Sequence, residues 1–149
     1  MNVIIKREFD YAIRICAYLS GNYDSGPISL SKIAEKLFIT RPFATKIVHK
    51  LKKSNIIATV QGKEGGVFLN QIPNELSIFS ILLAMGFDST INECIKHPRL
   101  CPLVATCKIH QFFSEQEKIM IKAYKTKMIS EFAFTDKELR WTVNVQIRQ

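Results

Sequence analysis

Apolar residues recur every three or four positions in the first third of the chain, which is the period of an amphipathic helix. A first helix is predicted between Lys6 and Ser20, and the segment GNYDSGP ends it. Ser29 and Thr40 are typical N-cap residues and predict two further short helices. Because only two residues separate the second helix from the cap of the third, the pair predicts a helix-turn-helix. The inward positions of the pair are Leu30, Ile33, Ala34 and Leu37, then Ala44, Ile47, Val48 and Leu51.

The pattern changes to short apolar runs after the third helix. Two strands are predicted, at Ile56–Val60 and at Val67–Leu69, with a glycine-rich loop between them. This is the pattern of a β-hairpin wing, whose tip at residues 62–66 carries Lys63. Glycine lets such a tip approach a phosphate backbone closely. A nucleotide-binding phosphate loop is excluded, because neither Ser nor Thr follows the lysine and the glycine spacing differs.

Two further helices are predicted in the second half of the chain. The segment NELSIFSILLAMG reads as a buried helix that Asn74 caps and Gly86 stops. A long helix is predicted over residues 111–134. Its apolar stripe is formed by Phe113, Met120, Tyr124, Met128 and Phe132, and is widened by Ile121 and Ile129. A long helix that leaves a small domain needs cover for such a stripe, and the usual cover is the same helix of a second copy, so we expect a homodimer.

These elements together predict a mainly α fold, namely a winged helix-turn-helix with a small β-hairpin wing and a long C-terminal dimerisation helix. The predicted parts are residues 1–72 (DNA-binding domain), 73–110 (connecting helix and cysteine loop) and 111–149 (dimerisation helix and tail). The tail is ambiguous, because Thr135 favours a short helix whereas WTVNVQI alternates like a strand.

Charge indicates what the helix-turn-helix binds. The chain has 149 residues, 47% of them apolar, a formal net charge of +8 and a pI of about 9.4, which favours polyanionic partners. No acidic residue lies between Thr40 and Asn55, and the second helix of a helix-turn-helix is the one that enters the major groove. Double-stranded DNA is therefore the predicted partner. The candidate contacts are Arg41, Thr45, Lys46, His49 and Lys50 on the helix, with Lys63 on the wing.

Several other classes of protein are not favoured. The N-terminus has neither the apolar run nor the cleavage site of a signal peptide. The apolar stretch IFSILLAMGF is far shorter than the roughly 20 residues of a membrane span. We therefore expect a cytoplasmic protein that does not bind membranes. We also expect no enzyme, because the sequence shows no Ser/His/Asp set, nucleotide loop or zinc-protease helix.

Three of the four cysteines lie in one segment, CIKHPRLCPLVATCKIH, with the spacing C-x6-C-x5-C. These gaps are longer than the C-x2-C pairs of most structural zinc sites. Thiols stay reduced in the cytoplasm, so a disulfide is disfavoured. An iron–sulfur cluster, a zinc ion, a thiol redox switch and no site at all remain open, and a cluster would need a fourth ligand from elsewhere. Cys16 lies on the apolar stripe of the first helix and is expected to be a core thiol.

Four stretches of the chain resemble the Rrf-two family of bacterial regulators, over residues 1 to about 134. They are FDYAIRICAYLS, ISLSKIAEKLFITRPFATKIVHKLKKSNII, GKEGGVFL and the cysteine segment, in which CPLVATC is the most specific. The resemblance implies a homodimeric winged-helix repressor that binds a palindromic operator. It also implies an iron–sulfur cluster on Cys94, Cys101 and Cys107, whose state sets DNA affinity in response to nitric oxide, redox or iron.

The resemblance leaves two candidates for the fourth ligand. NsrR-like members use a carboxylate from the first helix of the partner subunit, and Asp10 matches that position. IscR-like members use a histidine shortly after the third cysteine, and His110 matches that one. The acidic residue in the first helix favours Asp10, because the IscR-like residue there would be basic. A carboxylate ligand implies a 4Fe–4S cluster and a histidine ligand a 2Fe–2S cluster.

Overall fold

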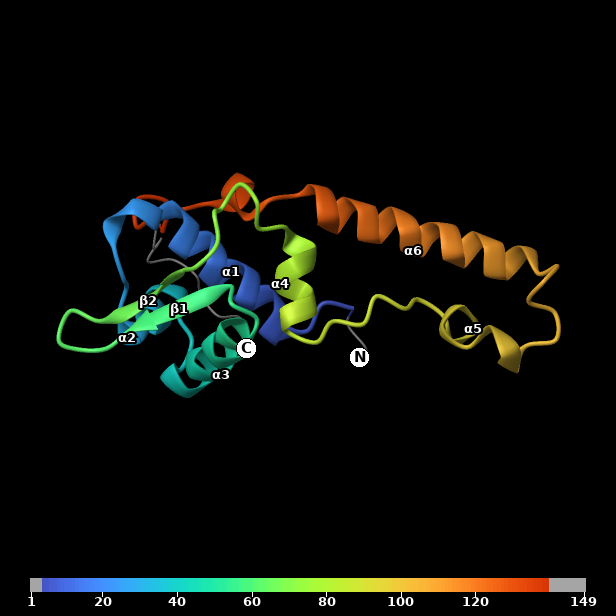
Figure 1. Cartoon of the computed structure of the whole chain (residues 1–149), viewed down its shortest axis with the longest axis horizontal. Coiled ribbons are helices and arrows are strands. Elements are labelled where there is room, and N and C mark those ends of the chain that lie inside the picture. Colours follow the sequence, from blue (N-terminus) through green and yellow to red (C-terminus); the bar gives the residue numbers. More distant parts are fainter. Residues whose placement is uncertain (1–3, 140–149) are drawn as a thin grey trace, which may run out of the picture.

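Within residues 4–69, the N-terminal half of the chain forms three α-helices, one short 3-10 helix and a β-hairpin (Figure 1). The computed structural model describes residues 4–139. The elements of this half are α1 (Arg7–Gly21), η1 (Tyr23–Ser25), α2 (Leu30–Leu37), α3 (Arg41–Lys53), β1 (Ile57–Val60) and β2 (Gly66–Leu69).

The predicted helix-turn-helix is confirmed, with both of its caps. The Ser29 hydroxyl accepts a hydrogen bond from the Lys32 amide at 3.2 Å, and the Thr40 hydroxyl accepts one from the Phe43 amide at 3.4 Å. Phe38 adopts a left-handed conformation (φ 53°) in the turn between the two helices. All the predicted inward positions of α2 and α3 are buried except Leu30, which is half-buried.

The predicted wing is confirmed as an antiparallel pair in which Ile57 lies opposite Leu69. Ile28 adds a short bridge to Val67, with reciprocal backbone hydrogen bonds of 2.9 and 2.8 Å. A Cβ on Gly66 would lie 2.4 Å from the Ile28 backbone, so this close approach requires glycine. The wing is therefore anchored to the segment that leads into α2.

The second half contains α4 (Ile78–Ala84), α5 (Glu93–Lys96), η2 (Pro98–Leu100), α6 (Lys108–Thr126) and η3 (Ile129–Phe132). Figure 1 shows α6 extending away from the N-terminal half and carrying α5 near its far end. Within residues 4–139, no helix has the length and apolar character needed to cross a bilayer.

Two predicted helix boundaries are wrong for the same reason. The helix predicted from Asn74 begins at Ile78, after Ser77 has capped it, and the helix predicted to reach residue 134 ends at Thr126. At these places the backbone pairs across the chain instead: Ser77 forms a β-bridge with Met128, and the Ile78 amide donates to the Lys127 carbonyl at 2.9 Å. This pairing fixes the base of α6 against the start of α4.

The core joins α1, α4 and the segment after α6. An aromatic series also links α1 to α6 through Phe87, which follows α4. The ring centroids of Phe9 and Phe87 lie 5.8 Å apart, and those of Phe87 and Tyr124 lie 6.0 Å apart. Residues 127–134 continue along α1, where the Phe134 amide donates to the Ala17 carbonyl at 3.4 Å. The Phe134 backbone can lie this close to α1 because Gly21 has no Cβ atom there.

The apolar residues of α6 and η3 lie in two different surroundings. Met120 and Tyr124 pack against the core of the same chain, and Ile129 is completely buried there. In contrast, Ile109, Phe112 and Ile119 are exposed by 66%, 54% and 61%. The apolar surface left for a partner therefore differs from the predicted stripe. Residues 141–147, predicted as a possible strand, lie outside the described residues.

Candidate DNA-binding surface and cysteine loop

The outer face of α3 carries five of the six predicted DNA contacts. Arg41, Thr45, Lys46 and His49 are exposed and Lys50 is half-buried, because the apolar residues of α3 occupy its inward face. Lys63, the sixth, is exposed in the loop between β1 and β2.

Two hollows flank this face of α3. The larger, of about 670 Å³, is lined by Arg41, Pro42, Thr45, Lys46, His49, Lys50 and Lys53. The smaller, of about 400 Å³, lies between α3 and the hairpin and includes Thr59, Val60 and Gln61. Arg41, Thr45 and His49 line both hollows, so they form the ridge between them. Lys52 donates to the Thr59 hydroxyl at 2.8 Å and joins α3 to the wing. Arg41 on the ridge and the lysines that line the hollows make this surface basic, which suits contact with the phosphate backbone of DNA.

An acidic residue that the sequence did not single out lies beside this surface. The carboxylate of Glu8 in α1 forms ion pairs with the ammonium groups of Lys46, at 3.0 Å, and of Lys50, at 3.5 Å. The hydrogen bond from Lys46, with the charge of Lys50, lowers the pKa of the Glu8 carboxyl. The sequence gives no signal for this contact, because it joins two helices that are far apart in the chain.

The three clustered cysteines lie at the far end of α6 (Figure 1). Cys94 is in α5, Cys101 follows η2 and Cys107 is the N-cap of α6. All three are half-buried free thiols. Cys16, in contrast, is completely buried, and burial raises its pKa. The expectation that Cys16 is a core thiol is confirmed.

His110 lies against two of the three thiols. Its Nδ1 atom is 3.3 Å from the Cys94 sulfur, and its backbone amide donates to the Cys107 sulfur at 3.4 Å. Across the described part of the chain, however, no three His, Cys, Asp or Glu side chains converge closely enough to hold a metal ion. The donor set, soft thiols with an imidazole beside them, has the chemistry that an iron–sulfur cluster or zinc requires. The loop thus fits such a group by its chemistry, whereas its three thiols are not gathered round one point.

Asp10, the other predicted fourth ligand, lies elsewhere. It pairs with Arg14 of the same helix at 2.9 Å. Figure 1 shows α1 in the N-terminal half, separated from the cysteine loop at the tip of α6. Within one chain the structure therefore brings His110 to the cysteines and does not bring Asp10 there.

Two polar contacts that the sequence did not reveal hold the start of the cysteine loop. The Glu117 carboxylate of α6 accepts from the Ile91 amide at 3.0 Å, and the Asn92 side chain accepts from the Cys94 amide at 3.3 Å. The Asn92 contact caps α5. The position of Cys94 is therefore fixed by the contact of Glu117 in α6 with Ile91 and by the cap that Asn92 provides.

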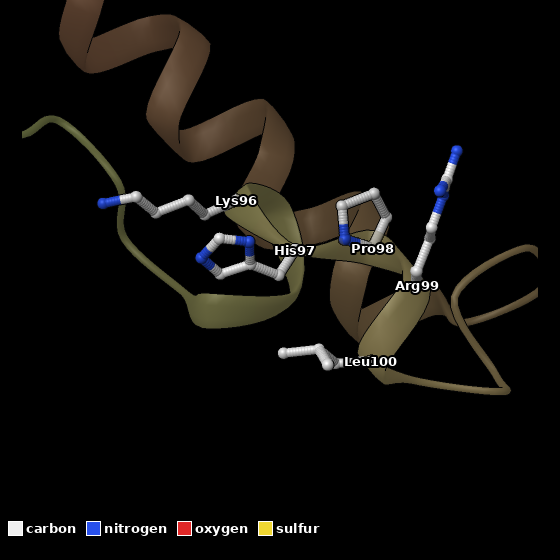
Figure 2. Close-up of a pocket in the computed structure, with 5 residues that line it drawn as sticks. All are labelled: Lys96, His97, Pro98, Arg99 and Leu100. Carbon is white, nitrogen blue, oxygen red and sulfur yellow. The ribbon is translucent and has the colours of Figure 1, made fainter.

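The loop between Cys94 and Cys101 encloses a hollow of about 430 Å³ lined by residues 96–100. Figure 2 shows the Lys96 and His97 side chains pointing to one side and Arg99 pointing away from them. Lys96 forms an ion pair with Asp88 and thereby holds the pKa of that carboxyl well below its usual range. These basic groups do not converge on one point, so the hollow is not built as an anion site.

Comparison with known proteins identifies the family. The Rrf2 family, described as iron-dependent transcriptional regulators, matches residues 5–133. The regulator NsrR of Oceanobacillus iheyensis is 23% identical over 136 residues, which cover 91% of this chain and 92% of that protein. Among solved structures, CymR, the global cysteine regulator of B. subtilis, has a TM-score of 0.71 at 14% identity, covering 89% of this chain and 96% of CymR. IscR of T. potens has a TM-score of 0.66 at 16% identity, covering 88% of this chain and 85% of IscR. The chain therefore belongs to the Rrf2 family of DNA-binding transcriptional regulators and has a winged helix-turn-helix fold.

Proposed function

We propose that this protein is a homodimeric cytoplasmic repressor whose affinity for a palindromic operator is set by an iron–sulfur cluster on Cys94, Cys101 and Cys107. The observation that carries the proposal is the cysteine loop, in which three half-buried free thiols share one segment and His110 contacts two of them. Thiolates are the ligands that iron–sulfur clusters prefer. When bound, the cluster supplies an iron centre that reacts with nitric oxide and oxygen.

DNA contact is assigned to α3 and the wing. We assign base contacts to Arg41, Thr45 and His49, which line both hollows beside α3, and phosphate contacts to Lys46, Lys50 and Lys63. The two copies in a dimer would place their recognition helices in successive turns of the major groove. A change in the spacing of these helices then changes the affinity for the operator.

The geometry favours His110 as the fourth ligand within one chain, because its imidazole already lies 3.3 Å from the Cys94 sulfur. Asp10 is the alternative, and it requires Asp10 of the partner subunit to reach the loop. The variants Asp10→Asn and His110→Gln separate the two: the ligand variant alters the visible spectrum and electron paramagnetic resonance of the protein prepared without air, and the other leaves both unchanged.

A second candidate function is thiol-based sensing without a cluster, and zinc stabilisation of the same loop is a third. The contact between Cys94 and His110 supports both, since an imidazole beside a thiol suits a reactive thiolate or a shared metal. CymR of Staphylococcus aureus, solved in an oxidized form, shares the fold with a TM-score of 0.69 at 19% identity over 89% of this chain and 96% of CymR.

Purification without air distinguishes these functions. A visible absorption band with iron and sulfide bound per chain supports the cluster, and a colourless zinc-containing protein supports the zinc alternative. Binding of the cluster-loaded protein to genomic DNA fragments is then measured before and after exposure to nitric oxide. Equal affinity in the two states would refute the switch, and a metal-free protein whose affinity responds to thiol oxidants would establish the thiol-based function.

A further inference from the structure

Glu8 forms ion pairs with two lysines of the recognition helix α3. It lies in the first turn of α1, and its carboxylate is 3.0 Å from the Lys46 ammonium and 3.5 Å from that of Lys50. Its side chain is 19% exposed, whereas that of Lys46 is 60% exposed. The Lys50 ammonium also lies 3.5 Å from the Met85 carbonyl. Both lysines are thus directed towards oxygen atoms of their own chain.

The position of α1 relative to α3 is fixed by apolar and cation–π contacts as well. The rings of Tyr11 and Phe43 lie 5.7 Å apart, and the Arg7 guanidinium lies over both, at 5.5 and 5.3 Å from their centroids. Glu8 is adjacent to Arg7 in the sequence, so its carboxylate is held close to α3 by a packed interface. The ion pairs therefore do not depend on the chance conformation of an isolated surface side chain.

A carboxylate at this place works against DNA binding. A phosphate that approaches Lys46 or Lys50 has to displace Glu8 as the counterion of that lysine, and it also meets the negative charge of Glu8. Binding to DNA of arbitrary sequence comes almost entirely from contacts between lysine or arginine and phosphate. A lysine–phosphate contact contributes about equally on every DNA sequence. A charge that weakens phosphate contacts therefore lowers the affinity for DNA in general, including DNA of arbitrary sequence.

We propose that Glu8 restrains Lys46 and Lys50 and so lowers the affinity of the protein for DNA, including DNA of arbitrary sequence. The inference rests on the proposed contact of α3 with DNA. It assigns to α1 an effect on DNA binding that is independent of any cofactor in the cysteine loop.

Replacement of Glu8 by Gln tests the proposal on a mixed-sequence duplex, with binding followed by fluorescence anisotropy over a range of salt concentrations. Release of the lysines is expected to raise the affinity by about tenfold per lysine at ~0.1 M salt and to steepen the salt dependence by about 0.9 per added phosphate contact. Glu75→Gln is the matched control, because Glu75 is exposed and forms no ion pair among the described residues. A Glu8→Gln variant that behaves like Glu75→Gln, or that binds more weakly than wild type, overturns the inference.

Lysine variants test the same idea without altering α1. Lys53 is exposed and has no acidic partner in residues 4–139, so Lys53→Met is expected to lower the salt slope by about one, and Lys46→Met by less. In the Glu8→Gln background the two losses are expected to become equal. Equal losses in the wild-type background contradict a restraint by Glu8. If neither Arg41→Gln nor Lys53→Met weakens binding, α3 does not contact DNA and the proposed function itself fails.

Discussion

At the scale of single residues, the four cysteines have the same side chain but differ in burial, and we expect them to differ in reactivity for that reason. Cys16 is completely enclosed in the core, which raises the pKa of its thiol, whereas the three loop cysteines are half-buried at the tip of α6. A thiol reacts as its thiolate and has to be reached by the reagent. The reactive thiols of the chain are therefore expected to be the three in the cysteine loop.

Alkylation of the metal-free, reduced protein with iodoacetamide is expected to modify Cys94, Cys101 and Cys107 and to leave Cys16 unmodified. Mass spectrometry of the peptides measures the extent at each site. In denaturant all four sites are expected to react, which serves as the control. Modification of Cys16 in the native state at the rate of the loop thiols would contradict its burial.

The sequence predicted individual residues well where local spacing decides their surroundings. The inward positions of α2 and α3 and the burial of Cys16 follow from the helical period alone. Glu8 had no such signal, because its partners Lys46 and Lys50 belong to another helix and the contact depends on how α1 packs on α3. The family resemblance did indicate Asp10, but its proposed role requires a second copy of the chain, and a local pattern does not reveal contacts between copies.

At the scale of elements, the segment after α6 stabilises α1 through close backbone contact. Gly21, the last residue of α1, lies so near this segment that an added Cβ would be 2.0 Å from the Phe134 carbonyl oxygen. Nearby, the Tyr18 hydroxyl donates to Asp136 at 2.7 Å, and Lys36 of α2 pairs with the same carboxylate at 3.1 Å. Asp136 thus joins the C-terminal segment to α1 and α2 together.

Gly21→Ala is expected to destabilise the protein by about 2 kcal/mol, because the new methyl group collides with backbone that has little freedom to move. Helix propensity alone would favour alanine by about 1 kcal/mol, so the sign of the change tests the contact. Thermal unfolding followed by circular dichroism measures it, with Ser20→Ala as the neighbouring control. A melting temperature equal to or above wild type would show that residues 127–134 do not lie against α1.

Asp136→Asn is expected to remove part of the acid sensitivity of folding. The hydrogen bond from Tyr18 and the charge of Lys36 lower the pKa of Asp136 in the folded state. Its contribution is therefore present above the unfolded pKa of about 3.9 and is lost as the pH falls through the folded value. Because the side chain is 46% exposed, solvent screening limits the contribution to about 0.5 kcal/mol at neutral pH.

Urea unfolding of wild type and Asp136→Asn across the acid range measures this effect. The variant is expected to be less stable at neutral pH, and the two curves are expected to converge as the pH falls through the lowered pKa of Asp136. A constant difference at every pH would mean that the Asp136 charge contributes nothing and that the substitution acts through packing.

The sequence predicted the ends of helices correctly where a capping residue determines them. The predictions were wrong where backbone pairing with a distant segment determines them. Ser29 and Thr40 cap α2 and α3 as their positions in the sequence indicate. Asn74 has the same chemistry, yet it lies in a turn over residues 73–75, and α4 begins later because the bridge to Met128 holds Ser77 in an extended conformation. Met128 is distant in the sequence, and a local pattern does not reveal that pairing.

At the scale of the whole molecule, α6 leaves an exposed apolar surface. Ile109, Phe112 and Ile119 lie on one face of the helix, and more than half of each side chain is exposed. In a twofold dimer each of these residues is buried twice, once in each copy. The proposed homodimer supplies the cover that the single chain lacks.

Ile119→Glu is expected to raise the dissociation constant of the dimer by about a hundredfold, because each copy would bury an unpaired carboxylate in an apolar contact. Gln111→Glu adds the same charge on an exposed position of α6 about 80° from Ile119 around the helix and is the control. Sedimentation velocity over a range of protein concentrations measures both. A variant that remains dimeric like the control would place the dimer contact on another surface.

The separation of the cysteine loop from the DNA-binding half has a mechanical consequence. With 19 residues, α6 is about 28 Å long, and its base is held by the pairing of residues 77–78 with 127–128 and by the packing of Met120 and Tyr124 against the core. The part of α6 beyond Met120 is a rod about 18 Å long, so a pivot of about 10° displaces its tip by about 3 Å. A movement of the cysteine loop at the tip of α6 therefore produces a smaller displacement, with a larger force, at the base of the helix. The stiffness of the contacts at the base, more than the contacts at the tip, then determines how much of a change in the cysteine loop is transmitted to the DNA-binding half.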